Sequence, residues 1–201
     1  IKDSSEQHVF NFISSWFVYG ETSLPAKENA CCKPKGFYSI TKLCAEQLVE
    51  SYCKTYKIPY RIIRLSNIYG KNDMGVSKKK NALQFLISEL SNNRDISLYH
   101  EGNFVRDYMH VKDACKAIKL VVEDGKINEI YNVGSGQSYR FKDIIEMAAV
   151  NLNSTSKIGA MKPPEFHNIV QVKDMVLDIT KLKNLGYYES ITIEEGISEL
   201  C

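Results

Sequence analysis

The sequence predicts an α/β protein built on a mainly parallel sheet. Short apolar runs rich in β-branched and aromatic residues, such as residues 9–13 (V-F-N-F-I) and 60–65 (Y-R-I-I-R-L), alternate with longer segments of helical pattern. Strands that alternate with helices favour units in which successive strands run parallel. The chain has 201 residues, of which 44% are hydrophobic, so it can bury one sizeable core.

The elements are expected in a definite order. The strand over 9–13 ends in two serines, Ser14 and Ser15, and precedes the first helix. The expected helices cover residues 38–56, 82–90, 113–122 and 142–152, and the further strands cover 60–65, 96–99, 108–111 and 130–133. Pro163 and Pro164 predict an irregular segment over 162–174. Thr192 and Glu195 have the spacing of a capping box, which predicts the start of a final helix.

A candidate catalytic group lies at the first strand and the first helix. Ligands of open α/β sheets bind at the carboxyl ends of the strands, where Ser15 is expected. Tyr38 and Lys42 are four residues apart, so they share one face of the helix. The lysine ammonium favours the ionised phenol, which makes Tyr38 a candidate general acid or base, with Ser15 bonded to the same reacting oxygen. The spacing alone is weak evidence, because Tyr108 and Lys112 repeat it where a strand is expected to enter a turn.

A second strand end reinforces this site. The strand over 60–65 continues as S-N-I-Y-G, which brings Ser66 and Asn67 to the same sheet edge as Ser15. Three separate segments therefore converge on one crevice. This convergence is the main argument from the residues for a functional site.

Composition narrows the class of protein. The formal net charge is only +2, so we expect no nucleic-acid partner and no attraction to an anionic membrane, and we interpret the K-K-K run at 78–80 as a solvated loop. There is no run of eighteen apolar residues and no signal-peptide pattern, so no membrane segment is expected. The six cysteines form no C-x-x-C pair, which predicts reduced thiols of a cytoplasmic protein and no metal site.

Five motifs follow one another along the chain. They are Ser15 three residues before V-Y-G, Y-S-I-T-K at 38–42, R-L-S-N-I-Y-G at 64–70, G-N-F-V-R-D-Y-M-H-V-K-D at 102–113, and Y-N-V-G-S-G at 131–136. Together they resemble the extended short-chain dehydrogenase/reductases. More narrowly, the chain resembles the NAD-dependent epimerase/dehydratase family acting on nucleotide sugars, the group that includes UDP-glucose 4-epimerase.

The resemblance implies catalytic and cofactor-binding roles. Ser15, Tyr38 and Lys42 match the catalytic triad of the family. Tyr38 and Lys42 would also bind the cofactor, with Lys42 on the nicotinamide ribose and Ser66 beside the carboxamide. The implied cofactor is NAD, and NADP is not excluded, because the discriminating residue would lie upstream of Ile1.

The resemblance also implies substrate contacts. Ser15, Asn67 and Asn81 match substrate-contacting residues, and Arg106 matches an arginine that binds the nucleotide diphosphate. A planar guanidinium suits that role, because it can engage phosphate oxygens at two places. Two alternatives stay open at this point. Arg106 could instead pair with neighbouring Asp107 at the surface, and Asn67 could be a turn residue that ends a strand.

Two departures from the family pattern limit these expectations. Members that eliminate water between C4 and C6 of the sugar carry an Asp-Glu pair where this chain has Trp16 and Phe17, so 4,6-dehydratase chemistry is not expected. The glycine-rich G-x-x-G-x-x-G fingerprint that meets the dinucleotide pyrophosphate does not occur. Because the chain begins with Ile1 rather than Met, we expect about one hundred further residues upstream to carry that fingerprint.

The predicted fold is therefore the C-terminal part of a Rossmann-type doubly wound parallel sheet plus a smaller mixed α/β substrate-binding region. Residues 1–70 would form the first part, and residues 71–201 mainly the second, with some segments returning to the sheet. The expected activity is that of an NAD-dependent nucleotide-sugar epimerase. Alternatives are an NAD(P)H-dependent reductase or synthase for 4-keto-6-deoxysugar nucleotides, and an inactive truncated member. The expected partners are a nucleotide-diphosphate sugar and a second copy of the chain in a homodimer.

Overall fold

A three-stranded parallel sheet forms the centre of the larger part of the molecule. The computed structural model describes residues 8–73 and 81–201, so the basic run at 78–80 lies outside the described residues. The strands β1 (Phe10–Ser15), β2 (Tyr60–Leu65) and β7 (Glu129–Val133) are hydrogen-bonded in the order β1-β2-β7. Ser15 lies beside Leu65, and Leu65 beside Val133, so the three carboxyl ends form one edge. The predicted parallel α/β architecture is confirmed.

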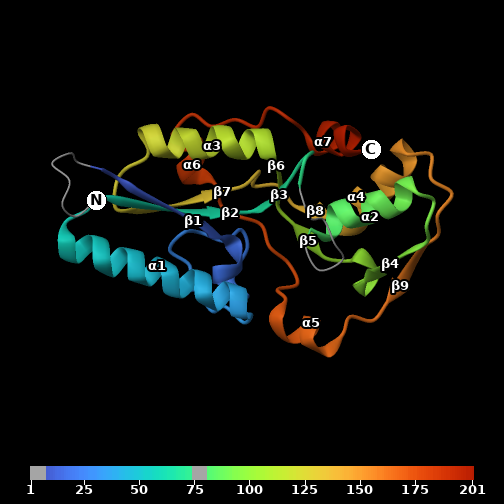
Figure 1. Ribbon diagram of the computed structural model, residues 1–201, viewed down its shortest axis with the longest axis horizontal. Coiled ribbons are helices and arrows are strands. Elements are labelled where there is room, and N and C mark those ends of the chain that lie inside the picture. Colours follow the sequence, from blue (N-terminus) through green and yellow to red (C-terminus); the bar gives the residue numbers. More distant parts are fainter. Residues whose placement is uncertain (1–7, 74–80) are drawn as a thin grey trace.

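Helices cover both faces of this sheet. Figure 1 shows α1 (Phe37–Tyr56) on one face and α3 (Val111–Asp124), with the short α6 (Thr180–Asn184), on the other. At the start of α1, Ser39 Oγ accepts from the Gly36 N–H at 3.0 Å and donates to the Gly36 carbonyl at 2.8 Å. These bonds satisfy backbone groups that a helix start leaves unpaired, which fixes where α1 begins.

A second region packs beside the sheet around its own core. It contains the strands β3 (Asn67–Tyr69), β4 (Ile96–Tyr99), β5 (Val105–Arg106), β6 (Tyr108–His110), β8 (Tyr139–Arg140) and β9 (Ile158–Met161). They pair as β3 with β6, β4 with β9 and β5 with β8. The helices α2 (Ala82–Ser91), α4 (Phe141–Asn151) and α7 (Ile193–Leu200) complete the region. Leu83, Ile87 and Leu90 recur at helical spacing on α2 and bury its inner face.

A buried carboxylate joins the two regions. The side chain of Asp107 is fully buried between β5 and β6. Its oxygens accept from the backbone N–H groups of Ser135 at 2.8 Å, Gly136 at 3.1 Å and Leu177 at 3.2 Å. Ser135 and Gly136 follow β7, so one side chain ties the sheet, the second region and the C-terminal segment together.

A buried ion pair holds α1 on the sheet. Arg64 Nη2 on β2 lies 2.6 Å from Glu46 Oε2 on α1, and both side chains are less than 5% exposed, at 3% and 4%. Arg64 Nε donates to Glu46 Oε1 at 3.0 Å, so the contact is bidentate. The guanidinium also lies over the Tyr19 ring, 4.6 Å from its centroid. A two-point contact of this kind sets the position of α1 along the strands.

Most of the expected elements are present with boundaries within about two residues. The expectation of an irregular segment over 162–174 was wrong in part, because α5 (Glu165–Val170) forms there with Pro164 at its N-cap. Proline is tolerated at the start of a helix, where its missing N–H would have no partner within the helix. The spacing of Tyr108 and Lys112 places them on β6 and α3, so they do not share a helix face.

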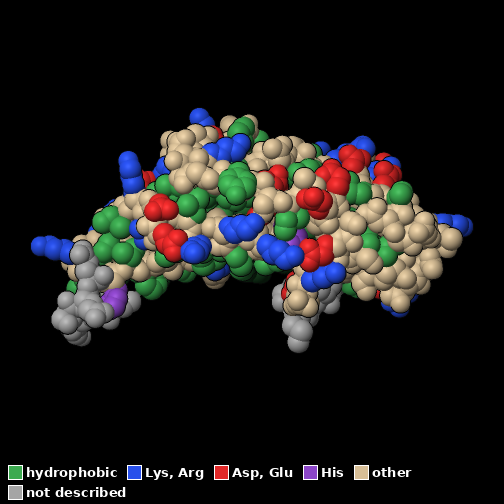
Figure 2. Space-filling model, turned by 90° about the horizontal axis from the view of Figure 1, so that it is seen from above, with side chains coloured by type: hydrophobic (Ala, Val, Ile, Leu, Met, Phe, Trp, Pro, Cys, Tyr) green, Lys and Arg blue, Asp and Glu red, His purple; other side chains and the backbone are tan. Residues whose placement is uncertain are grey.

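The surface carries mixed charge on the face shown in Figure 2, where basic and acidic side chains lie interspersed. Ion pairs elsewhere described on the surface include Lys112 with Glu199 at 3.4 Å and Lys119 with Glu123 at 3.8 Å. Interleaved charges of opposite sign largely cancel at a distance. Among the described residues, no helix is both long and apolar enough to span a lipid bilayer.

The ion pair beneath α1 generates a stability prediction. We expect Glu46→Gln to lower the free energy of unfolding by about 3 kcal/mol, because Arg64 would keep its charge in a buried site without a carboxylate. Chemical denaturation measures the change. The matched control is Glu123→Gln, which removes an exposed pair with Lys119 and should cost less than about 0.5 kcal/mol. Equal losses in the two variants would contradict this account.

Candidate active site

The strand β1 ends at the first candidate catalytic residue. Ser15 is 8% exposed and caps the short helix η1 (Trp16–Tyr19), with its Oγ accepting from the Phe17 N–H at 3.4 Å. The neighbouring Ser14 is 3% exposed, and its hydroxyl has no hydrogen-bond partner among the described residues. Two serine hydroxyls therefore lie at the carboxyl edge of the sheet, as the sequence predicts.

Tyr38 and Lys42 reach the same edge from the first turns of α1. Lys42 Nζ donates to the Ile13 carbonyl of β1 at 3.0 Å and lies 5.9 Å from the centroid of the Tyr38 ring. The Tyr38 ring is 55% exposed and meets the Phe17 ring edge-on, with centroids 6.2 Å apart. Lys42 thus joins the helix to the end of β1, and Tyr38 lies beside the turn that Ser15 caps. Their catalytic roles stay a prediction.

Ser66 and Asn67 follow the end of β2, at this edge. The Ser66 N–H donates to the Val133 carbonyl at 2.8 Å, whereas its buried Oγ has no hydrogen-bond partner among the described residues. An unpaired buried hydroxyl is costly, so this atom fits a site that receives a polar ligand group. Asn67 begins β3, and its Nδ2 donates to the Asp107 carbonyl at 3.0 Å. The alternative that Asn67 is a turn residue ending a strand is therefore wrong.

Arg106 is a buried cation held by neutral groups. Its side chain is 9% exposed and donates to the carbonyls of Val105 at 2.9 Å, Val172 at 2.6 Å and Lys173. Burial lowers the pKa of the guanidinium. In the described part of the chain no carboxylate hydrogen-bonds to it. The expected alternative of a surface ion pair with Asp107 is wrong, because Asp107 bonds to backbone N–H groups elsewhere.

Asn81 lies at the start of α2 in the second region. Its backbone is left-handed, with φ of 55°, and its Oδ1 accepts from the Gln84 N–H at 3.3 Å. Its Nδ2 donates to Asp73 Oδ2 at 2.7 Å. The side chain therefore caps a helix, and its described hydrogen bonds do not link it to the sheet edge. A substrate contact by Asn81 stays a prediction.

An aromatic row that the sequence did not predict connects the two ends of the site. Phe17, which touches Tyr38, stacks on Trp16 with centroids 3.8 Å apart. The Arg106 guanidinium lies over both the Trp16 ring at 5.3 Å and the Phe104 ring at 4.8 Å. The relevant signal was the position of Trp16 and Phe17 directly after Ser15. In the sequence this position indicates only that proton-transferring groups are missing.

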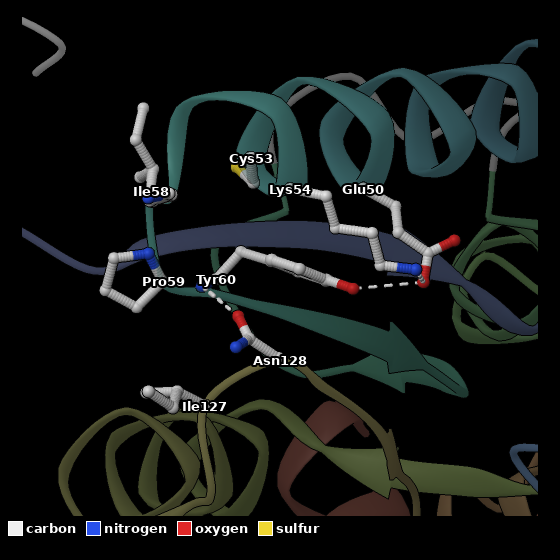
Figure 3. Close-up of a pocket in the computed structure, with 9 residues that line it drawn as sticks. Glu50, Cys53, Lys54, Ile58, Pro59, Tyr60, Ile127 and Asn128 are labelled. Atoms are coloured by element: carbon white, nitrogen blue, oxygen red, sulfur yellow. Dashed lines mark hydrogen bonds and ion pairs between the residues drawn. The ribbon is translucent and has the colours of Figure 1, made fainter.

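A pocket also lies at the opposite, amino-terminal end of β2 (Figure 3). In it the Tyr60 hydroxyl donates to Glu50 at 3.0 Å, and Glu50 pairs with Lys54 at 3.2 Å. Burial raises the pKa of Tyr60 to about 12. Asn128 Oδ1 accepts from the Tyr60 N–H at 3.3 Å. These groups satisfy one another, and the pocket is remote from the strand ends that carry Ser15 and Ser66.

Comparison with known proteins identifies the family. The family model described as NAD dependent epimerase/dehydratase matches residues 2–134, which is more than half of the chain. The chain belongs to this family. The resemblance found from the five motifs is thereby confirmed.

Individual relatives cover nearly all of this chain. A putative UDP-glucose 4-epimerase of Methanocaldococcus jannaschii is 30% identical over 189 residues, covering 91% of this chain and 58% of the relative. A trifunctional UDP-glucose 4,6-dehydratase, 3,5-epimerase and 4-keto-L-rhamnose reductase of Arabidopsis thaliana is 30% identical over 197 residues, covering 94% and 28%. The solved structure of a UDP-glucuronic acid 4-epimerase of Bacillus cereus, with UDP-glucuronic acid and NAD, has a TM-score of 0.85 at 26% identity, covering 96% and 60%.

The chain matches only part of each curated relative. The chain spans between 28% and 58% of the length of these two curated relatives. The Rossmann-type fold is shared with the solved structures.

The unpaired hydroxyl at the sheet edge generates the second prediction. Ser66→Ala is expected to leave the free energy of unfolding unchanged or to raise it by up to about 1 kcal/mol, because it removes a buried group without a partner. The control is Ser135→Ala, which removes a hydroxyl that donates to Asp107 at 2.9 Å and should lower stability by about 1 kcal/mol or more. Urea unfolding of both variants provides the comparison. Similar losses in the two would show that Ser66 Oγ is satisfied within the protein.

Proposed function

We propose that this chain supplies the catalytic edge and the diphosphate-binding side of an NAD-dependent nucleotide-sugar epimerase. The observation that carries the proposal is the contact from Lys42 Nζ to the Ile13 carbonyl, with Tyr38 on the same helix face. It brings a phenol and an ammonium from α1 to the strand end that bears Ser15. Membership of the family supports the assignment of these groups to sugar oxidation and reduction.

Tyr38, Lys42 and Ser66 are proposed to hold NAD. When bound, NAD accepts a hydride from a sugar carbon and returns it to the opposite face, which inverts the configuration. The unpaired buried hydroxyl of Ser66 fits a polar group such as the carboxamide. The sequence carries no G-x-x-G-x-x-G fingerprint, so the loop for the pyrophosphate is proposed to lie outside these 201 residues.

The proposed chemistry of the residues is proton transfer and positioning. Tyr38, as phenolate, takes the proton from a sugar hydroxyl and later returns one. Lys42 is proposed to place its positive charge beside the phenol, 5.9 Å from the ring centroid, and Ser15 to donate a hydrogen bond to the same sugar oxygen. Asn67 and Asn81 are proposed to contact the substrate. Inversion requires that the sugar turn while its nucleotide remains bound, so the tight contacts must be made by the nucleotide.

Arg106 is proposed to hold the nucleotide diphosphate. It is a nearly buried cation whose described hydrogen-bond partners are all neutral carbonyls. A desolvated guanidinium without a carboxylate gains strongly from an anion, and its planar fork matches two phosphate oxygens. The guanidinium also contacts the Trp16 and Phe104 rings, with its carbon 5.3 Å and 4.8 Å from their centroids. These features support a diphosphate ligand.

Loss of water between C4 and C6 of the sugar is not part of the proposal. The aromatic rings of Trp16 and Phe17 cannot transfer protons, and Trp16 is only 2% exposed. The name of the Arabidopsis relative includes such a dehydratase, but it also includes a 4-keto-sugar reductase. That name favours a second candidate, a reductase for 4-keto-6-deoxysugar nucleotides. It would use the same three catalytic residues with stoichiometric NAD(P)H.

Tyr38→Phe tests the catalytic assignment. In the full-length protein we expect kcat to fall by about 100-fold or more, because the phenol that moves the proton is lost. The control is Tyr52→Phe on the same helix, which should retain normal turnover. Turnover of two nucleotide sugars without added NADPH would support the epimerase, whereas stoichiometric NADPH consumption would support the reductase. Unchanged turnover of Tyr38→Phe would refute the assignment for both.

We further propose that the protein forms a homodimer through α1. The outer face of this helix exposes Leu48 by 70%, Tyr52 by 50% and Tyr56 by 44%, at a spacing of four residues. Large apolar side chains aligned on one helix face are typical of an interaction surface. A second copy can cover this face with its own α1 in a symmetric contact.

Leu48→Glu tests this surface. A buried carboxylate at a symmetric interface would meet its own copy, so we expect the variant to sediment as a monomer where the unmodified protein sediments as a dimer. Analytical ultracentrifugation measures the state of both. The control is Val150→Glu on α4, at a residue that is 74% exposed, which should not change it. A Leu48→Glu variant that stays dimeric would place the interface elsewhere.

A further inference from the structure

The short helix α5 lies between the candidate catalytic helix and the strand pair β4–β9. A Cβ added at Gly36, directly before α1, would lie only 3.3 Å from the Val170 Cβ at the end of α5. On its other side, the His167 ring lies 4.7 Å from the Tyr99 ring at the end of β4, with the ring planes inclined by 58°. Figure 1 shows α5 beside the amino-terminal end of α1. His167 therefore lies near the site rather than on a remote surface.

The segment that follows α5 also holds Arg106. The carbonyls of Val172 and Lys173, two and three residues after the last residue of α5, accept from the guanidinium. Tyr99 and Arg106 are likewise close in sequence, on β4 and β5. α5 is followed by the carbonyls that bind Arg106, and β4 with Tyr99 is followed by β5 with Arg106. These connections bring His167 and Arg106 into one area, although they are 61 positions apart in the sequence.

Basic residues gather around His167. Burial lowers the pKa of His167, and the positive charges of His100 and Arg106 lower it further. The imidazole is half-buried, and neither ring nitrogen has a hydrogen-bond partner among the described residues. Protonation of His167 is therefore unfavourable in the absence of an anion, because it would add a positive charge close to the buried Arg106.

Acidic groups also lie nearby, but burial lowers the pKa of Arg106 more than the charge of Asp174 raises it. Glu101 and Lys162 line a shallow pocket together with His100 and carry opposite charges. Glu165 lies on α5 in the turn that contains His167. Asp174 accepts the Val105 N–H at 2.9 Å, so one of its oxygens is already engaged. In the described part of the chain, no carboxylate forms a salt bridge with His167 or Arg106.

We propose that His167 is a second cationic contact for the diphosphate of the nucleotide sugar, acting beside Arg106, and that binding of this ligand takes up a proton on His167. The inference rests on the proposed function of Arg106 and adds a residue that the sequence analysis did not identify. A diphosphate carries charge along its length, so it can engage a guanidinium and an imidazolium together.

The pH dependence has a definite sign. In the free protein the depressed pKa keeps His167 neutral near neutral pH. A bound diphosphate stabilises the imidazolium, so the pKa of His167 is higher in the complex and affinity rises as the pH falls between these two values. UDP-glucose is the suitable probe, because its diphosphate has no ionisation near neutral pH, whereas the terminal phosphate of UDP has one.

The experiment measures UDP-glucose affinity of the full-length protein by titration calorimetry at several values from pH 8 to pH 6. We expect affinity to rise by about five-fold toward pH 6, which corresponds to roughly 1 kcal/mol of binding free energy. His167→Gln keeps a polar side chain but cannot become cationic, so its affinity should match the unmodified protein at pH 8 and stay flat. The control His8→Gln should behave as the unmodified protein.

Two further arms separate the possible failures. Arg106→Lys should weaken UDP-glucose binding at every pH, and if it binds normally the proposed diphosphate site fails together with this inference. If Arg106→Lys weakens binding but His167→Gln retains the full pH dependence, only the role of His167 is overturned. NAD is titrated in parallel, and a loss of NAD affinity in His167→Gln with unchanged UDP-glucose affinity would overturn the assignment to the substrate diphosphate.

Discussion

The bidentate ion pair between Arg64 and Glu46 is the contact on which the geometry of the site depends. It joins β2 to α1 in a buried position, where two short hydrogen bonds allow little sliding of the helix. Lys42 lies one helical turn before Glu46, and Tyr38 one turn before Lys42. With Glu46 held on the strand, these two residues are directed to the carboxyl edge of the sheet. Lys42 then completes the attachment at the Ile13 carbonyl.

Asp107 has the corresponding role for the second region. Its carboxylate binds backbone N–H groups from the turn after β7 and from the C-terminal segment. Arg106 is the residue before Asp107, so the backbone hydrogen bonds of Asp107 also fix the segment that carries the guanidinium. The same arrangement explains why Arg106 does not pair with its sequence neighbour. The carboxylate of Asp107 already accepts hydrogen bonds from backbone N–H groups, and Arg106 is a buried cation that donates to carbonyls.

The aromatic row between these anchors gives the site its chemical character. Phe17 and Trp16 lie between Tyr38 and Arg106, and they carry no group that can exchange a proton. The proposed acid and base groups are therefore Tyr38, Lys42 and Ser15. This separation suits the proposed reaction, in which a sugar oxygen is deprotonated at Tyr38 and the diphosphate is held at Arg106. It also accounts for the buried, neutral surroundings of Arg106, since rings and carbonyls hold a guanidinium without neutralising it.

Local patterns in the sequence determined the elements and one half of the site. Apolar runs and helical spacing located the strands of the sheet and α1 within about two residues, because period and turn residues act over short distances. The position of Ser15 and Ser66 at one edge followed from the rule that parallel strands share one carboxyl edge, and the four-residue spacing put Tyr38 and Lys42 on one face of α1. The two prolines predicted an irregular segment over 162–174, but α5 begins there directly after Pro164.

Tertiary structure alone decided the other half. Two of the carbonyl partners of Arg106 lie 66 and 67 residues away from it. His167 lies on α5, a helix that no local pattern predicted, and contacts Tyr99 on β4. The orphaned hydroxyl of Ser66 and the satisfied carboxylate of Asp107 are likewise properties of surroundings assembled from distant segments. Burial and electrostatic environment depend on which segments pack together, and this is set by the sum of many long-range contacts rather than by neighbours along the chain.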